Sequence, residues 1–355
     1  MELWPLQVSL ESPRDSDPPM STSHRSSSVN GTREPDGVTF FILQGLSSLG
    51  DRQMILFVIL LLGYIITQGG NSMIIFLVQN KATDPKLHSP MYFFLANLSF
   101  VDMVYTTTTI PKMLVGFLSD VSTISVPGCF LQMFFFIQLG ITSRGILTAM
   151  AYDRYLAICH PLHYTSIMTQ HIQLLLIAGA WAFGTFCTLP ANLITWHQPY
   201  CGPNVVKHGW GDPSSVRRLA CADTSVDNTV SLSLALVALL TTGVLILTSY
   251  VLIGISVSRM SVAQRLKAFG TCVSHLTVVS ISYTAASFVY ISYRVGNLSP
   301  EVRIIVAVLY AALTPFLNPV IYSLRNKELQ ESIRRTLVRF RSATVSVTKD
   351  ISTVS

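Results

Sequence analysis

The residues best suited to chemistry in this chain are ionisable groups that stand inside otherwise apolar sequence. Asp102 lies in one apolar tract, Arg144 lies in another, and Asp153-Arg154-Tyr155 closes the second tract. Charged side chains within a bilayer are costly, and they mark ion sites, switches or binding sites. An Arg near the bilayer midplane costs at least about 2.5 kcal/mol on insertion scales. We therefore expect Arg144 to pair with Asp102, the only buried acid in these tracts.

The tracts that hold these residues are long enough to cross a membrane. Half of the 355 residues are hydrophobic and 12% are charged, whereas a soluble domain carries about 25% charged residues. This composition argues against a soluble enzyme and against a disordered protein. Tracts of about 20 apolar residues without period-two alternation are typical of membrane helices. We predict an all-α membrane protein with a bundle of seven transmembrane helices, at 54–78, 91–114, 127–152, 172–194, 229–257, 269–292 and 304–324.

The basic residues predict how this bundle is oriented. With the N-terminus outside, the segments on the inner side carry 13 basic and 5 acidic residues. We expect a multi-pass protein of the plasma membrane, with an extracellular N-terminus and a cytoplasmic C-terminus. The net charge of +6 suits anionic membrane lipid as a partner and gives no reason to expect nucleic acid. Since no Ser/His/Asp set or metal cluster converges, neither an enzyme nor a cofactor is expected.

Three regions follow from this arrangement. Residues 1–53 form an extracellular tail, disordered to about 36 because it is rich in Ser, Pro and charge, with a glycosylation sequon at Asn30. Residues 54–324 form the seven-transmembrane domain. Residues 325–355 form a cytoplasmic tail that opens with a short amphipathic helix lying in the membrane interface. Its apolar stripe consists of Leu329, Ile333, Leu337 and Phe340.

Three of the six cysteines lie on the expected extracellular side. Cys129 opens the third helix, and Cys201 and Cys221 lie in the long loop 195–227. An oxidising environment allows a disulfide there. One of the three cysteines is then left over.

Several segments, in this order, point to one known family. They are Pro90-Met91-Tyr92-Phe93-Phe94-Leu95, Met150-Ala151-Tyr152-Asp153-Arg154-Tyr155, Lys267-Ala268-Phe269-Gly270-Thr271-Cys272 with Ser274-His275, and Pro315-Phe316-Leu317-Asn318-Pro319-Val320-Ile321-Tyr322. From about Phe40 to Arg341 the chain resembles the olfactory (odorant) receptors, a branch of the rhodopsin-like (class A) G-protein-coupled receptors. The resemblance implies a receptor that binds a small volatile ligand within the bundle. It further implies an olfactory-type stimulatory heterotrimeric G protein, a rise in cAMP, and the ciliary membrane of sensory neurons.

The resemblance also implies a switch near the cytoplasmic end. In the family, the Arg that corresponds to Arg154 is held in the resting state and contacts the G protein when the sixth helix swings outward. Pro319 kinks the seventh helix, which shapes packing whether or not it switches, and Lys267 either contacts the G protein or extends to lipid phosphate. The implied coupling and switch residues are Asp153, Arg154, Tyr155, Tyr250, Lys267, Asn318, Pro319 and Tyr322.

Asp102 resembles the sodium-site acid of rhodopsin-like receptors. Ser143 and Asn318 are the candidate ligands beside it. The alternative is a protonated Asp102 that is hydrogen-bonded to Asn71 and Asn318.

The outer half of the third helix has no acid that could bind an amine ligand. We therefore expect a small, mostly apolar and uncharged ligand, whose buried CH₂ groups contribute about 0.8 kcal/mol each. Tyr283, Ser287 and Tyr290 share one helix face, a pattern that plain packing also produces. With the resemblance, the expected ligand-binding residues are Phe136, Ile137, Gly140, Leu234, Ala238, Tyr283, Ser287 and Tyr290.

Two positions depart from the family pattern. Gly211 stands where the family has the cysteine that pairs with the one at the start of the third helix, here Cys129. A Cys201–Cys221 disulfide is then expected, although Cys129 pairing with either of them is the alternative. Arg144 stands where the family has Cys, and by pairing with Asp102 it is expected to displace any sodium ion. These departures leave a second reading of function open, a non-signalling or degenerate receptor-like membrane protein.

Overall fold

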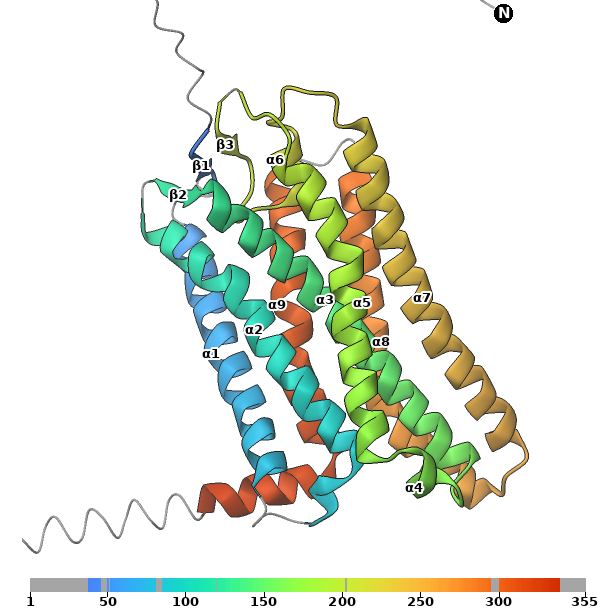
Figure 1. The fold of residues 1–355 in the computed structure, drawn as a ribbon. Coiled ribbons are helices and arrows are strands. Elements are labelled where there is room, and N and C mark those ends of the chain that lie inside the picture. The colour runs from blue at the N-terminus through green and yellow to red at the C-terminus, as the bar shows by residue number, and fades with distance from the viewer. Residues whose placement is uncertain are drawn as a thin grey trace, which may run out of the picture. The chain divides into compact units, whose positions relative to one another are not determined.

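Seven long helices lie side by side (Figure 1). The computed structural model describes residues 38–45, 50, 52–80, 85–119, 121–201, 203–294 and 300–338. The long helices are α1 (Arg52–Gln79), α2 (Pro90–Leu118), α3 (Val126–Cys159), α5 (Gln170–Trp196), α7 (Ser225–Ser258), α8 (Val262–Arg294) and α9 (Pro300–Arg325). Short elements join them: η2 (Pro85–His88), α4 (Tyr164–Ile167) and α6 (Pro213–Arg217). The seven-helix prediction is confirmed.

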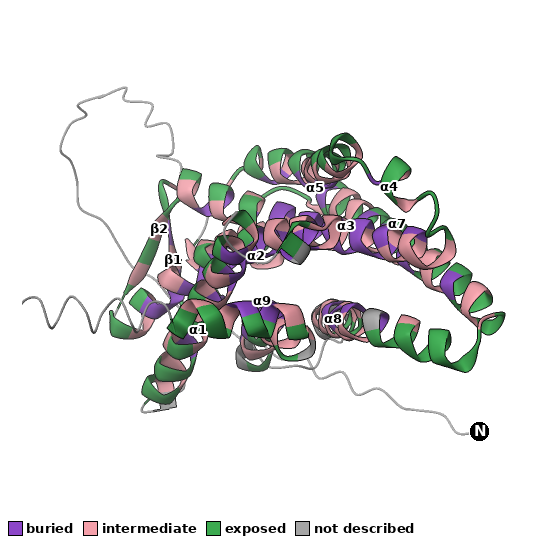
Figure 2. Cartoon of the chain, turned by 90° about the horizontal axis from the view of Figure 1, so that it is seen from below, coloured by how far each residue is buried: buried purple, intermediate pink, exposed green. Residues whose placement is uncertain are grey.

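Six of these helices, within the described residues, are long and apolar enough to cross a membrane, and α2 is the exception. This helix carries Asp102 and Lys112 within its span. It packs between α1 and α3, so much of its polar surface is covered by protein rather than by lipid. Figure 2 shows buried residues on the inward faces of α2 and α3. In contrast, α1 and α7 expose large apolar side chains such as Ile59 and Leu247, as expected of lipid-facing helices.

The helix α8 begins seven residues earlier than the predicted start at residue 269. Ser261 and Gln264 form a capping box: the Ser261 N–H donates to Gln264 Oε1 at 3.2 Å, and the Gln264 N–H donates to Ser261 Oγ at 3.5 Å. Such reciprocal bonds satisfy amide groups that a helix start leaves free. Lys267 therefore lies within the helix, where it is exposed.

A small three-stranded sheet lies at one end of the bundle, which we call the sheet end. Its central strand β1 (Phe40–Leu43) pairs antiparallel with β2 (Ser122–Ser125) and parallel with β3 (Val205–Val206). Phe41 is fully buried there in a cluster with Cys129, Phe130 and Val206. Residues 40–43 were expected to belong to an extracellular tail without strands, whereas they form the central strand of this sheet.

A further helix, residues 327–338, follows α9 at the opposite end, which we call the Arg154 end. Asn326 Oδ1 accepts a hydrogen bond from the Leu329 N–H at 3.0 Å, which starts the helix. Leu329 is fully buried and Ile333 packs against the bundle, whereas Leu337 is 53% exposed. The predicted amphipathic helix is thus confirmed, and Phe340 of its stripe lies outside the described residues.

Candidate functional site

The centre of the bundle joins three helices through buried amides. Asn318 Nδ2 on α9 donates to Asp102 Oδ2 on α2 at 2.6 Å. Asn71 Nδ2 on α1 donates to the Pro315 carbonyl at 3.4 Å. That carbonyl lies four residues before Pro319, which has no N–H to offer it, so Asn71 supplies a hydrogen bond that the helix cannot. Asn71 therefore contacts α9 and not Asp102, which differs from the protonated-acid alternative.

Arg144 does not form the direct ion pair with Asp102 that the sequence predicted. Its Nη1 donates to the Gly140 carbonyl of its own helix at 3.0 Å, and its Nη2 donates to the Tyr310 hydroxyl on α9 at 2.5 Å. Among the described residues, no carboxylate lies within 4.0 Å of this guanidinium. Its Nε is buried without a hydrogen-bond partner. The partner of Arg144 is therefore the Tyr310 hydroxyl on α9, and not the expected carboxylate of Asp102.

At the Arg154 end, Asp153 is held by a tyrosine and not by the neighbouring Arg. The Tyr164 hydroxyl on α4 donates to Asp153 Oδ1 at 2.7 Å. Burial, followed by the negative charge of Asp153, raises the pKa of Tyr164, so this hydroxyl stays protonated and can donate. Arg154 forms no ion pair within 4.0 Å among the described residues. Tyr155 Oη lies 3.0 Å from His160 Nε2.

His275 connects three helices on the same half of the bundle. Its Nε2 lies 2.9 Å from the Leu147 carbonyl on α3, and its Nδ1 lies 2.8 Å from the Tyr250 hydroxyl on α7. A carbonyl only accepts, so Nε2 carries the proton and Nδ1 accepts from Tyr250. His275 belongs to the family pattern in the sequence, but the pattern alone assigned it no role. Tyr322 is 1% exposed, and its hydroxyl has no partner within the described residues.

The expected ligand-binding residues lie nearer the sheet end, and aromatic side chains pack against one another there. The Phe136 ring stacks on Tyr105 with centroids 4.9 Å apart, and the Trp210 ring lies tilted against it with centroids 5.5 Å apart. Ile137 packs against a cluster that contains the buried Ala238.

The remaining expected residues divide between inward and outward positions. Tyr283 donates to Thr242 Oγ1 at 2.7 Å, and Gly140 lies against Tyr105 and Arg144. Leu234 is half-buried and Ser287 is exposed on α8. The side chain of Tyr290 lies outside the described residues. The structure thus brings Phe136, Ile137, Gly140, Ala238 and Tyr283 toward the interior and places Ser287 on the surface.

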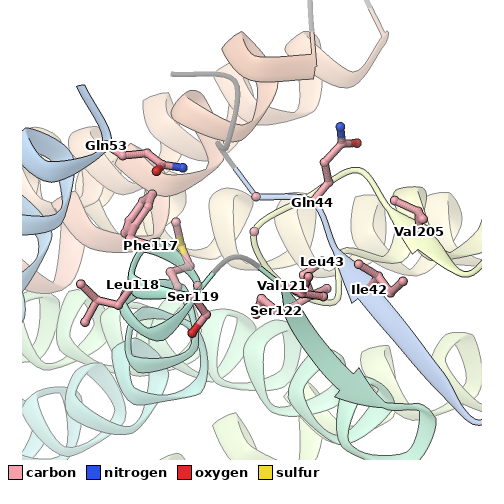
Figure 3. A pocket seen from close by; sticks show the side chains of 14 residues that line it. Ile42, Leu43, Gln44, Gln53, Phe117, Leu118, Ser119, Val121, Ser122 and Val205 are labelled. Atoms are coloured by element: carbon pink, nitrogen blue, oxygen red, sulfur yellow. The ribbon is translucent and has the colours of Figure 1, made fainter. Parts of the chain in front are cut away.

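A separate cavity of about 480 Å³ opens at the sheet end (Figure 3). It lies between β1, β2 and the end of α2, and its walls include Gln44, Gln53, Phe117 and Ser122. None of the expected ligand residues lines it. Its volume falls in the range of small-molecule sites.

The loop between α5 and α7 contains the predicted disulfide. Cys201 is bonded to Cys221, and Cys129 is free and buried. A Cβ added to Gly211 would lie 2.5 Å from Cys129 Sγ. The position where the family has a cysteine therefore lies beside Cys129 even though the sulfur is absent.

Comparison with known proteins adds to this geometry. A family profile described as olfactory receptor matches residues 60–340. The chain is 45% identical to olfactory receptor 6N1 of Homo sapiens over 85% of this chain and 96% of the relative. It is 42% identical to olfactory receptor 226 of Rattus norvegicus, over 84% and 92%. The crystal structure of squid rhodopsin superposes with a TM-score of 0.63 over 79% of each chain, at 19% identity.

Proposed function

The chain belongs to the olfactory receptor family of G-protein-coupled receptors, and we propose that it converts the binding of a small volatile ligand into activation of a stimulatory G protein. As a member of this family it is a multi-pass membrane receptor and not an enzyme. Its ligand is an odorant and its partner is a heterotrimeric G protein. The finer proposal concerns the ligand's chemistry, the type of G protein and the rise in cAMP.

The ligand proposed for this receptor is mostly apolar and uncharged. The inward residues Phe136, Ile137 and Ala238 are apolar, and Tyr283 offers one hydroxyl that is already paired with Thr242. A ligand that separates Phe136 from Trp210 replaces one apolar contact with another, which makes affinity depend on the ligand's shape. The proposed site therefore consists of the inward residues Phe136, Ile137, Gly140, Ala238 and Tyr283 with the half-buried Leu234, and it does not include the exposed Ser287.

The observation that carries the signalling proposal is the bond from His275 on α8 to the Leu147 carbonyl on α3. It holds the two helices together on the Arg154 half of the bundle. Outward movement of α8 breaks this bond and opens space beside Arg154, which is free to meet a G protein because no ion pair restrains it within the described residues. Lys267, exposed on α8, is then a contact for the G protein. Asn318, Pro319 and Tyr322 are proposed to adjust α9 during this movement.

We further propose that the sheet end is extracellular and that the Arg154 end is cytoplasmic. The Cys201–Cys221 disulfide at the sheet end suits an oxidising compartment. The helix 327–338 at the Arg154 end carries three basic and two acidic residues, and this small positive excess suits anionic lipid. Asn30 is then a glycosylation site, and the ciliary membrane of sensory neurons is the expected location.

An odorant panel tests the proposal in cells that contain an olfactory-type stimulatory G protein and a cAMP reporter. We expect at least one apolar volatile to raise cAMP in cells with the receptor at the surface. The matched control is Arg154→Ala, which should reach the surface and remain silent. A flat response to the whole panel, with surface staining equal to that of a working receptor, would favour a non-signalling receptor-like protein.

A further inference from the structure

A second, much smaller cavity lies in the middle of the bundle, where the resemblance predicts a sodium ion. Its volume of about 20 Å³ is close to the space that one water molecule needs, about 10–15 Å³. Four helices contribute to its wall. The polar residues among its lining are Asp102, Tyr105, Ser143, Arg144, Ser282, Tyr310 and Thr314.

The residues around this cavity do not fit a sodium ion. A hard cation needs several oxygen ligands, but Asp102 Oδ2 already accepts from the Asn318 amide group. That amide presents its N–H, and not its oxygen, to the acid. Arg144 lines the same cavity with a guanidinium that is positively charged at any physiological pH. A sodium ion in this space would therefore face a second cation at close range.

The guanidinium instead needs a negative charge that its hydrogen-bond partners do not supply. The Gly140 carbonyl and the Tyr310 hydroxyl are both neutral, and Nε is buried without a partner. Asp102 borders the same cavity and lies outside direct ion-pair distance. One water molecule in this cavity would accept from the guanidinium and donate to the carboxylate, and the volume is large enough for one.

We propose that Arg144 is the built-in cation of this cavity, that it balances Asp102 through one bridging water, and that the cavity therefore binds no sodium. In a receptor with a sodium site, the positive charge beside the acid is an ion from solution. Here that positive charge is the guanidinium of Arg144, which is part of α3. Arg144 thereby connects α3 to α9 through Tyr310 and to α2 through the proposed water, whether or not sodium is present. The resting state of this receptor is then independent of the sodium concentration.

The first test is the melting temperature of the purified receptor in sodium chloride and in potassium chloride at equal ionic strength. We expect the same melting temperature in both salts. A higher melting temperature in sodium, which Asp102→Asn abolishes, would overturn the proposal. This readout requires neither a ligand nor a G protein, so it can fail while the signalling proposal stands.

The second test is a double-mutant cycle of Arg144→Gln and Asp102→Asn. Each single change leaves one charge without its counterpart, so we expect each to lower the melting temperature and the double variant to lose less than the two losses combined. Arg144→Gln alone should acquire a sodium-dependent rise, and the double variant should not. Arg335→Gln, in the exposed pair with Glu331, is the matched control without any change in sodium response. Additive losses in the cycle would contradict a shared charge balance.

Discussion

His275 holds α8 against α3 through a hydrogen bond that only one tautomer can make. The bond is buried and crosses between the two helices, so it stabilises the resting arrangement and must be lost when α8 moves. A single bond of this kind contributes about 1 kcal/mol, which is about fivefold in a two-state equilibrium.

We predict that His275→Phe raises ligand-independent cAMP several-fold, because the aromatic ring remains while both hydrogen bonds are removed. The measurement is basal cAMP per receptor at the cell surface. Thr277→Val is the matched control, since the Thr277 hydroxyl bonds only within α8, to the Val273 carbonyl. Unchanged basal cAMP in His275→Phe at normal surface level would remove His275 from the switch.

Gly211 offers a second prediction at the residue scale. Gly211→Cys places a thiol beside Cys129 Sγ, so we expect a crosslink from α3 to the long loop. A disulfide typically contributes about 2–4 kcal/mol, and we expect the melting temperature to rise by about 5–10 °C. Gly211→Ala is the control, because its methyl group would press on the Cys129 sulfur and lower the melting temperature. Free thiols at both Cys129 and position 211 of the Gly211→Cys protein would contradict the loop geometry.

The sequence predicted which individual ionisable residues are buried, but it did not predict their hydrogen-bond partners. Asp102 and Arg144 were recognised as buried ionisable groups, but Tyr310, which contacts Arg144, could not be chosen from the sequence. That partner depends on how α9 rotates toward α3, and apolar helices leave this rotation undetermined. Tyr164 likewise had no role assigned from the sequence, because its hydrogen bond to Asp153 follows from the turn that α4 makes.

At the element scale, the long loop between α5 and α7 contains a buried histidine that makes its stability depend on pH. His208 in this loop is 1% exposed and its ring lies edge-on against Trp210 at 4.3 Å. Burial lowers the pKa of His208, and the charge of Asp212 only partly opposes this. Neutral His208 therefore favours the folded loop, and this stability is lost as the pH falls below about 6.5, the ordinary pKa of histidine.

We predict that the melting temperature of the purified receptor falls between pH 7.5 and 5.5, and that His208→Gln reduces this slope. Glutamine keeps a polar side chain of similar reach without a titrating group. His197→Gln is the control, because His197 lies in an exposed position at the end of α5. An equal slope in wild type and His208→Gln would place the acid sensitivity elsewhere.

Element boundaries show why the helices were predictable and the sheet was not. The apolar length of α5, α7 and α9 sets their limits to within a few residues, because lipid leaves no other way to satisfy the backbone. The start of α8 was missed, although Ser261 and Gln264 have the spacing of a capping box. The strands are at most four residues long and pair residues 40–43 with residues about 80 and 160 positions away, and no local pattern encodes such pairing.

On the scale of the whole molecule, the bundle is closed both at the proposed ligand site and at the proposed G-protein site. Aromatic side chains fill the expected ligand region, and the His275 bond holds α8 against α3. Both positions lie along α3, which contacts α2, α5, α7 and α8. A ligand that separates Phe136 from Trp210 would therefore contact the helix that also carries Leu147 and Arg154.

The central claim is that an odorant inside this bundle moves α8 and admits a G protein beside Arg154. Nucleotide exchange measures it most directly, with purified receptor in lipid nanodiscs, a stimulatory G protein and an odorant whose binding is measured on the same sample. The account predicts that the odorant accelerates exchange with the wild type, whereas Arg154→Ala binds the odorant equally well and leaves exchange at the basal rate. Odorant binding to the wild type with no change in nucleotide exchange would contradict it.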